Sequence, residues 1–170
     1  MIKKSKHNVK FLKLLQEISI LLCISLAVTP AFKMRFWNIG AEGQVLVGAL
    51  ATAACMKYLA GSVNPVVLIF VMLFAGIFAG MLWGIIPAIF KAHFGTNETL
   101  FTLMMNYVAI QLVAFMIAVW VPSGSQVVGV INRESKIGWL PNVFGQKYII
   151  NIAVVLVVMI AVYIYLRYSK

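Results

Sequence analysis

The chain is constrained most by a run from Pro65 to Phe90 that contains no charged residue. As a helix this run would be about 39 Å long, enough to cross a hydrocarbon core of about 30 Å with some tilt. Two further uncharged runs cover residues 99–121 and 148–166. Backbone polar groups in lipid must bond within their own segment, so we predict that all three runs are membrane-spanning helices.

The composition supports the same fold class. Hydrophobic residues make up 63% of the chain and charged residues 11%, whereas about a quarter of a soluble domain is charged. The net charge of +10 does not indicate a nucleic-acid partner, because the basic residues flank apolar runs instead of forming a patch with interleaved aromatics. The sequence therefore predicts an all-α integral membrane protein in contact with lipid.

Two shorter apolar segments, at about 18–32 and 45–60, precede the long runs. The first follows a basic head and resembles a secretory signal. Its cleavage site is poor and longer apolar runs follow, so we favour an uncleaved membrane segment. The basic head carries the lysines Lys3, Lys4, Lys6, Lys10 and Lys13.

The stretch "FWNIGAEGQ" lies between these two segments. Its Asn38 and Glu42 would be costly on a lipid-facing helix, while Gly40 and Gly43 permit a break in the helix. Two interpretations are open from composition. The stretch is either a surface loop or a broken helix at membrane depth, where free N–H groups meet a solute.

A stripe of small residues marks the long run at 65–90. Gly76, Gly80 and Gly84 recur every four residues, so they share one helical face and allow another helix to pack closely. Trp83 and Pro87 suggest that the helix nears an interface or a bend there.

Polar residues also share a face in "GTNETLFTLMMNY", where Glu98, Thr102 and Asn106 are spaced by four. Either these groups bond within the helix bundle, or they form the polar wall of a solute path. Asn106 lies two turns inside the apolar run, where an amide needs a partner or water. Thr96 or Asn97 is expected to cap the start of this helix.

The sequence contains no motif for catalysis, a metal or a cofactor. It has no serine–histidine–acid set, HExxH motif, paired carboxylates or phosphate-binding glycine loop. Cys23 and Cys55 form no CxxC and have no histidine at ligand spacing. We therefore predict no catalytic residue, no metal site and no cofactor, and we do not expect an enzyme.

"FWNIGAEGQVLVGALA" and "GMLWGIIPAIFKAHFGTNETLFTLMMNYVA" together resemble the membrane permease subunit of ABC importers of the nucleoside and simple-sugar group. That group belongs with the ribose and branched-chain amino-acid permeases. The similarity covers about residues 18–170 and is strongest at 33–48 and 81–109. It implies a solute path for nucleosides or simple sugars that would be lined by Asn38, Glu42, Gln44, Glu98, Thr102 and Asn106.

The resemblance also implies a multi-pass protein of the bacterial plasma membrane with several partners. These are a second permease subunit, cytoplasmic ATPase subunits and an extracellular substrate-binding lipoprotein. Such permeases are longer than this chain and continue past "YLRYSK" into a segment that docks on the ATPase. The alternative is therefore a truncated subunit that assembles in the membrane without transporting.

Charge counting bears on how the chain crosses the membrane. The N-terminal lysines favour an inside N-terminus, and the resemblance places Arg167 and Lys170 inside too, which requires an even number of crossings. Either 36–60 enters the membrane and returns, or 18–32 and 45–60 form one broken span. We thus predict one permease domain over 1–170, a polytopic helix bundle with a broken or re-entrant helix near 36–60. In it Asn38, Glu42 and Gln44 would face a protein cavity.

Overall fold

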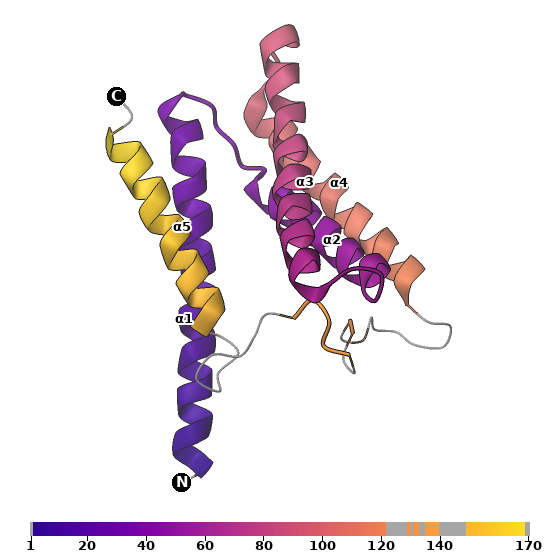
Figure 1. Cartoon of the computed structure of the whole chain (residues 1–170). Helices are drawn as coiled ribbons and strands as arrows, with labels where there is room; N and C mark the ends of the chain where they lie inside the picture. Colours follow the sequence, from indigo (N-terminus) through magenta and orange to yellow (C-terminus); the bar gives the residue numbers. More distant parts are fainter. Residues whose placement is uncertain (1, 122–128, 130, 133–134, 140–148, 169–170) are drawn as a thin grey trace. The chain divides into compact units, whose positions relative to one another are not determined.

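The computed structural model describes residues 2–121, 129, 131–132, 135–139 and 149–168, and these residues form five α-helices (Figure 1). The helices group into two compact units. One contains the N-terminal helix and the C-terminal helix, and the other covers Trp37–Trp139. The helices are α1 (Ile2–Lys33), α2 (Ala41–Leu59), α3 (Pro65–Phe94), α4 (Glu98–Trp120) and α5 (Ile149–Tyr168).

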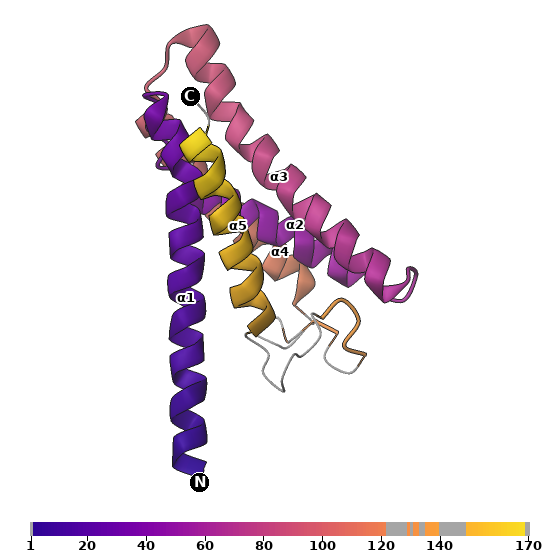
Figure 2. The same cartoon turned by 60° about the vertical axis from the view of Figure 1, so that its left-hand side comes forward.

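In the first unit, α1 and α5 pack against each other and run in the same direction (Figure 2). Helix α1 begins at Ile2, well before the apolar segment predicted at 18–32. Lysine is a good helix former, so the basic head continues the helix although hydropathy marks only its apolar part. The part of α1 that is long and apolar enough to cross a membrane is Lys13–Lys33.

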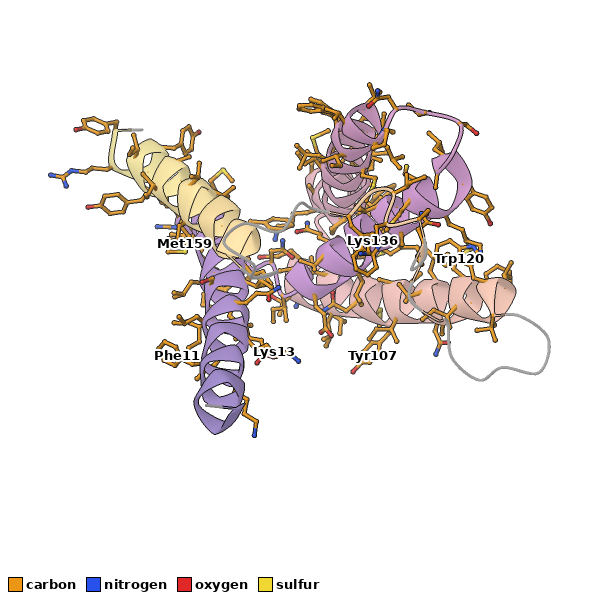
Figure 3. All side chains as sticks on the ribbon, turned by 60° about the horizontal axis from the view of Figure 1, so that its bottom comes forward. Phe11, Lys13, Tyr107, Trp120, Lys136 and Met159 are labelled. Carbon is orange, nitrogen blue, oxygen red and sulfur yellow. The ribbon has the colours of Figure 1, made fainter. Side chains whose placement is uncertain are left out.

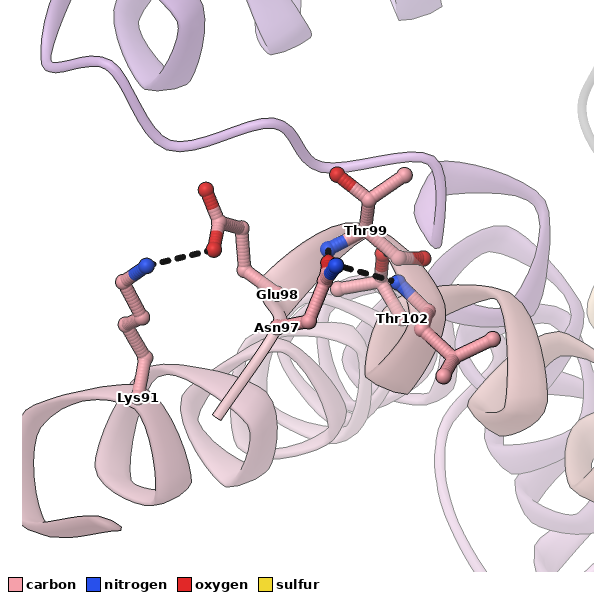
Figure 4. A network of polar contacts seen from close by, with 6 residues as sticks. Lys91, Asn97, Glu98, Thr99 and Thr102 are labelled. Carbon is pink, nitrogen blue, oxygen red and sulfur yellow. Dashed lines mark hydrogen bonds and ion pairs between the residues drawn. The ribbon is translucent and has the colours of Figure 1, made fainter. Parts of the chain in front are cut away.

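In the second unit, α3 and α4 form an antiparallel hairpin, and α2 packs against both of them. Helix α3 continues past the predicted end at residue 90, because its end is set by Gly95, which adopts a left-handed conformation and donates its N–H to the Lys91 carbonyl. The cap predicted for α4 is confirmed as Asn97. Its Oδ1 accepts from the N–H groups of Thr99 at 3.0 Å and Leu100 at 3.2 Å (Figure 4).

The predicted glycine stripe lies where α3 contacts α2. A Cβ atom added at Gly76 would lie 2.6 Å from Thr52 Oγ1, and one added at Gly80 would lie 3.2 Å from the Gln44 carbonyl oxygen. A Cβ atom at Gly84 would lie 2.2 Å from Gln44 Nε2. A methyl group at any of the three positions would press against α2, so each glycine permits the close approach of α2.

Aromatic and loop residues hold the C-terminal ends of α2 and α4 in this unit. Trp120 Nε1 donates to the Tyr58 hydroxyl at 3.0 Å, which ties α4 to α2, whereas Tyr107 projects from α4 away from α2 (Figure 3). Asn132 Nδ2 donates to the Met56 carbonyl at 3.0 Å, so a later loop caps the last turn of α2. Between α4 and α5, residues 122–128, 130, 133–134 and 140–148 lie outside the described part of the chain.

Three helices are long and apolar enough to cross a membrane, counted over the residues that the structure describes: Lys13–Lys33, Pro65–Phe94 and Glu98–Trp120. Within α5, a shorter apolar segment covers Val155–Tyr168. The chain leaves helical conformation between Lys33 and Ala41, which overlaps the start of the region near 36–60 predicted to be broken. The molecule is an all-α polytopic membrane protein.

Candidate functional site: a polar junction of three helices

Helix α2 begins beside the interior of α4, not beside its end. The residues of α4 that contact the start of α2 are Thr102 and Asn106. They follow the first residue of α4 by one and two turns, which corresponds to about 6 and 12 Å along the helix axis. The junction of the stretch 36–44 with α2 therefore lies within the length of the α3–α4 hairpin.

Asn106 joins this junction through both ends of its side-chain amide. Its Oδ1 accepts from the Gly43 N–H at 2.8 Å, and its Nδ2 donates to the Ile39 carbonyl at 3.0 Å. The residue is 5% exposed. Gly40, the N-cap of α2, offers no side-chain cap, so the cap of α2 comes from another helix.

Thr102 reinforces the junction one turn closer to the start of α4. Its hydroxyl accepts from the Ile39 N–H at 3.2 Å and donates to the Thr99 carbonyl at 3.2 Å. Asn38 adds a local turn, because its Oδ1 accepts from the Gly40 N–H at 2.8 Å. The N–H and carbonyl of Ile39 are thus both bonded to α4 side chains.

A narrow cleft runs along this junction between α2, α3 and α4. It has no room for a water-sized sphere in the described conformation. A solute could therefore enter it only if the helices moved apart. Its walls are formed by Asn38, Gly40, Gln44, Trp83, Pro87, Thr102 and Met105.

Trp83 brings an unsatisfied polar group to the cleft. Its Nε1 is buried and has no hydrogen-bond partner among the described residues. Its carbonyl lacks the usual helical donor, because Pro87 has no N–H. Trp83 and Pro87, which suggested an interface or a bend, lie inside α3, since the helix continues to Phe94 and Pro87 is buried. Their one-turn spacing beside the glycine stripe could have placed them at this contact.

The predicted path residues do not all lie together. Asn38, Gln44 and Thr102 line the cleft, and Asn106 lies next to it. Glu42 is exposed and does not line the cleft. Glu98 forms an ion pair with Lys91 at the end of the α3–α4 hairpin (Figure 4). The structure thus brings together the amides and the threonine and leaves both carboxylates outside the cleft.

Gly40 and Gly43 allow the start of α2 to lie close to α4, because neither residue has a side chain. A Cβ atom added at Gly43 would lie 2.8 Å from Asn106 Oδ1 and 3.2 Å from Trp83 Nε1. One added at Gly40 would lie 2.9 Å from Thr102 Cβ. The sequence identified both glycines as helix breakers, but their close contact with α4 depends on tertiary packing that the sequence does not display.

Comparison with known proteins places the chain in a family. Residues 11–170 match the family described as branched-chain amino acid transport system / permease component. The guanosine ABC transporter permease protein NupP of Bacillus subtilis (strain 168) is 33% identical over 104 residues, which cover 61% of this chain and 29% of NupP. The match thus spans less than a third of that relative. No solved structure matches the chain. Because the family match covers nearly the whole chain, the protein belongs to this family of transport-system permease components.

Proposed function

We propose that this chain forms part of the solute path of an ABC importer that takes up nucleosides. The family membership supports a permease subunit, and the likeness to a guanosine permease supports the nucleoside class. The solute would pass the polar junction where α2 starts. ATP would be hydrolysed by cytoplasmic partner subunits, and an extracellular binding lipoprotein would deliver the solute.

The observation that carries this proposal is the unsatisfied indole N–H of Trp83. A buried donor without an acceptor costs about 1–3 kcal/mol, so such a group in a native protein requires an explanation. In the same cleft lies Gln44, a half-buried residue with a side-chain amide. Nucleosides carry ring carbonyls, ring nitrogens and ribose hydroxyls, so they can accept hydrogen bonds from both groups.

Passage requires the cleft to widen, because it now has no room for a water-sized sphere. We propose that partner subunits drive this widening and that the chain works as a multi-pass subunit of the bacterial plasma membrane beside a second permease subunit. The close glycine contacts between α2 and α3 would close the path again between cycles.

The proposal is tested by nucleoside uptake in cells that supply the whole importer. Trp83→Phe keeps an aromatic ring but removes the N–H, so we expect KM for uptake to rise by about five- to tenfold, the effect of one lost hydrogen bond to the solute. Tyr107→Phe is the matched control, because it removes one polar group from an aromatic residue that is exposed. Its KM should stay at the wild-type value.

An unchanged KM for Trp83→Phe would remove this indole from the solute path. Absence of nucleoside uptake in the wild-type importer, with ATPase subunits that fail to co-purify, would contradict the transport function itself.

A further inference from the structure

Thr102 and Asn106 make their polar contacts with the backbone of the stretch 39–43. The Asn106 amide is bonded at both ends, to Gly43 and to Ile39, and the residue is 5% exposed. The Thr102 hydroxyl bonds to Ile39 and Thr99, and that residue is 1% exposed. The Asn106 amide could form two further hydrogen bonds and the Thr102 hydroxyl one, but burial leaves their polar atoms little access to a solute.

These bonds replace what the backbone loses where helical conformation is interrupted. The first N–H groups of a helix have no partner within it, and in a membrane each such group needs an acceptor from elsewhere in the protein. For α2, Asn106 supplies that acceptor to Gly43. Its Nδ2 at the same time binds the Ile39 carbonyl, which precedes the helix and has no place in its bonding pattern.

We infer that Thr102 and Asn106 are positioning residues, which hold the start of α2 on α4 and thereby orient Asn38 and Gln44 toward the solute. The hydrogen bonds of Thr102 and Asn106 to Ile39 and Gly43 are called the clamp below. This inference rests on the proposed function for the identity of the solute, but the geometry of the clamp does not depend on transport. Residues that contact a solute set its affinity and the preference among related solutes. Residues that only position the site change the exposure of the stretch 38–44 and the maximal uptake rate, and they leave the preference unaltered.

The first measurement follows the exposure of the junction without any transport. In a full-length chain with Cys23→Ala and Cys55→Ala, a single cysteine replaces Ala41, and its labelling by a membrane-impermeant maleimide is timed in membranes that contain the whole importer. Asn106→Ala removes both bonds and should raise the labelling rate by about tenfold, because the junction then opens more often. Gln111→Ala is the control, since Gln111 is an exposed amide on the same helix. It should leave the rate unchanged.

A conservative pair guards against a general folding defect. Thr102→Val removes the acceptor for the Ile39 N–H, whereas Thr102→Ser keeps it, so Val should raise the labelling rate and Ser should restore it to near the wild-type value. The amount of each variant in the membrane is measured alongside. A labelling rate in Asn106→Ala and Thr102→Val within twofold of wild type would overturn the clamp.

The second measurement compares uptake of two nucleosides. For a positioning residue we expect Asn106→Ala to lower the maximal rate of both in the same proportion, with their ratio of rates unchanged. A changed ratio with unchanged labelling would make Asn106 a solute ligand and overturn the inference. If the wild-type importer moves no nucleoside, the labelling measurement alone still decides on the clamp, and only the proposed function fails.

Discussion

Replacing Gly43 with alanine should push α2 away from α4 and lower the free energy of unfolding by about 1–3 kcal/mol, the usual cost of overpacking. The added methyl group would lie 2.8 Å from Asn106 Oδ1, 3.2 Å from Asn106 Cα and 3.2 Å from Trp83 Nε1. Asn106 cannot turn aside without losing its bonds to Gly43 and Ile39. The backbone itself has to move, and the capping bond to α2 lengthens.

The measurement is unfolding of the purified protein in mixed micelles with increasing dodecyl sulfate, followed by helical circular dichroism. Gly129→Ala serves as the control, because a Cβ atom there would have no atom of the described residues within 4 Å. A double variant, Gly43→Ala with Asn106→Ala, separates the causes. Since removing the Asn106 side chain removes the closest clash, the double variant should lose less stability than the sum of the two single variants. Strict additivity, or equal stability of Gly43→Ala and Gly129→Ala, would contradict the close contact.

The elements that the sequence predicts well are those that depend on neighbouring residues alone. In lipid, the backbone groups of an uncharged run such as 65–90 must bond to one another, which favours a helix. Helices α3 and α4 lie where the runs predict them. The shared face of Gly76, Gly80 and Gly84 is likewise predictable, because a spacing of four places residues on one face of a helix whatever packs against it. The cap at Asn97 depends on the next three residues and is local for the same reason.

The arrangement of the junction could not be predicted, because it depends on the rotation of one helix against another. Glu42 and Gly43 are neighbours in sequence, but successive residues point about 100° apart around a helix. In the structure Gly43 is buried against α4 and Glu42 is exposed. Nothing in the sequence fixes this rotation, so Glu42 and Gln44 were expected to share one cavity wall although only Gln44 lines the cleft.

The hydrogen-bond partners of Asn106 could not be predicted from the sequence either. The sequence indicates that an amide two turns inside a membrane helix needs a partner, and it leaves open whether that partner is a solute or protein. Its two bonds reach the backbone of residues 63 and 67 positions earlier. A backbone group carries no side-chain signature, so no pattern of residue types could have identified it.

Leu68 gives the other large expected effect, at the end of the unit away from the junction. It is 0% exposed, and a Cβ atom added at Gly138 would lie 3.3 Å from its Cδ2, so it contacts the loop that caps α2. Leu68→Ala leaves a cavity beneath that loop and should lower the free energy of unfolding by about 2–5 kcal/mol.

Leu73→Ala is the matched control, since Leu73 is on the same helix and 53% exposed. Both variants remove the same atoms from α3 and change its helix propensity equally, so a difference between them measures packing alone. Dodecyl sulfate unfolding gives that difference. The loop should also detach in Leu68→Ala, because Asn132 then loses the packed surface that holds it against the Met56 carbonyl. A cysteine in place of the exposed Lys136 should consequently react faster with maleimide in Leu68→Ala than in Leu73→Ala. Equal reactivity together with equal stability would show that Leu68 does not anchor the loop.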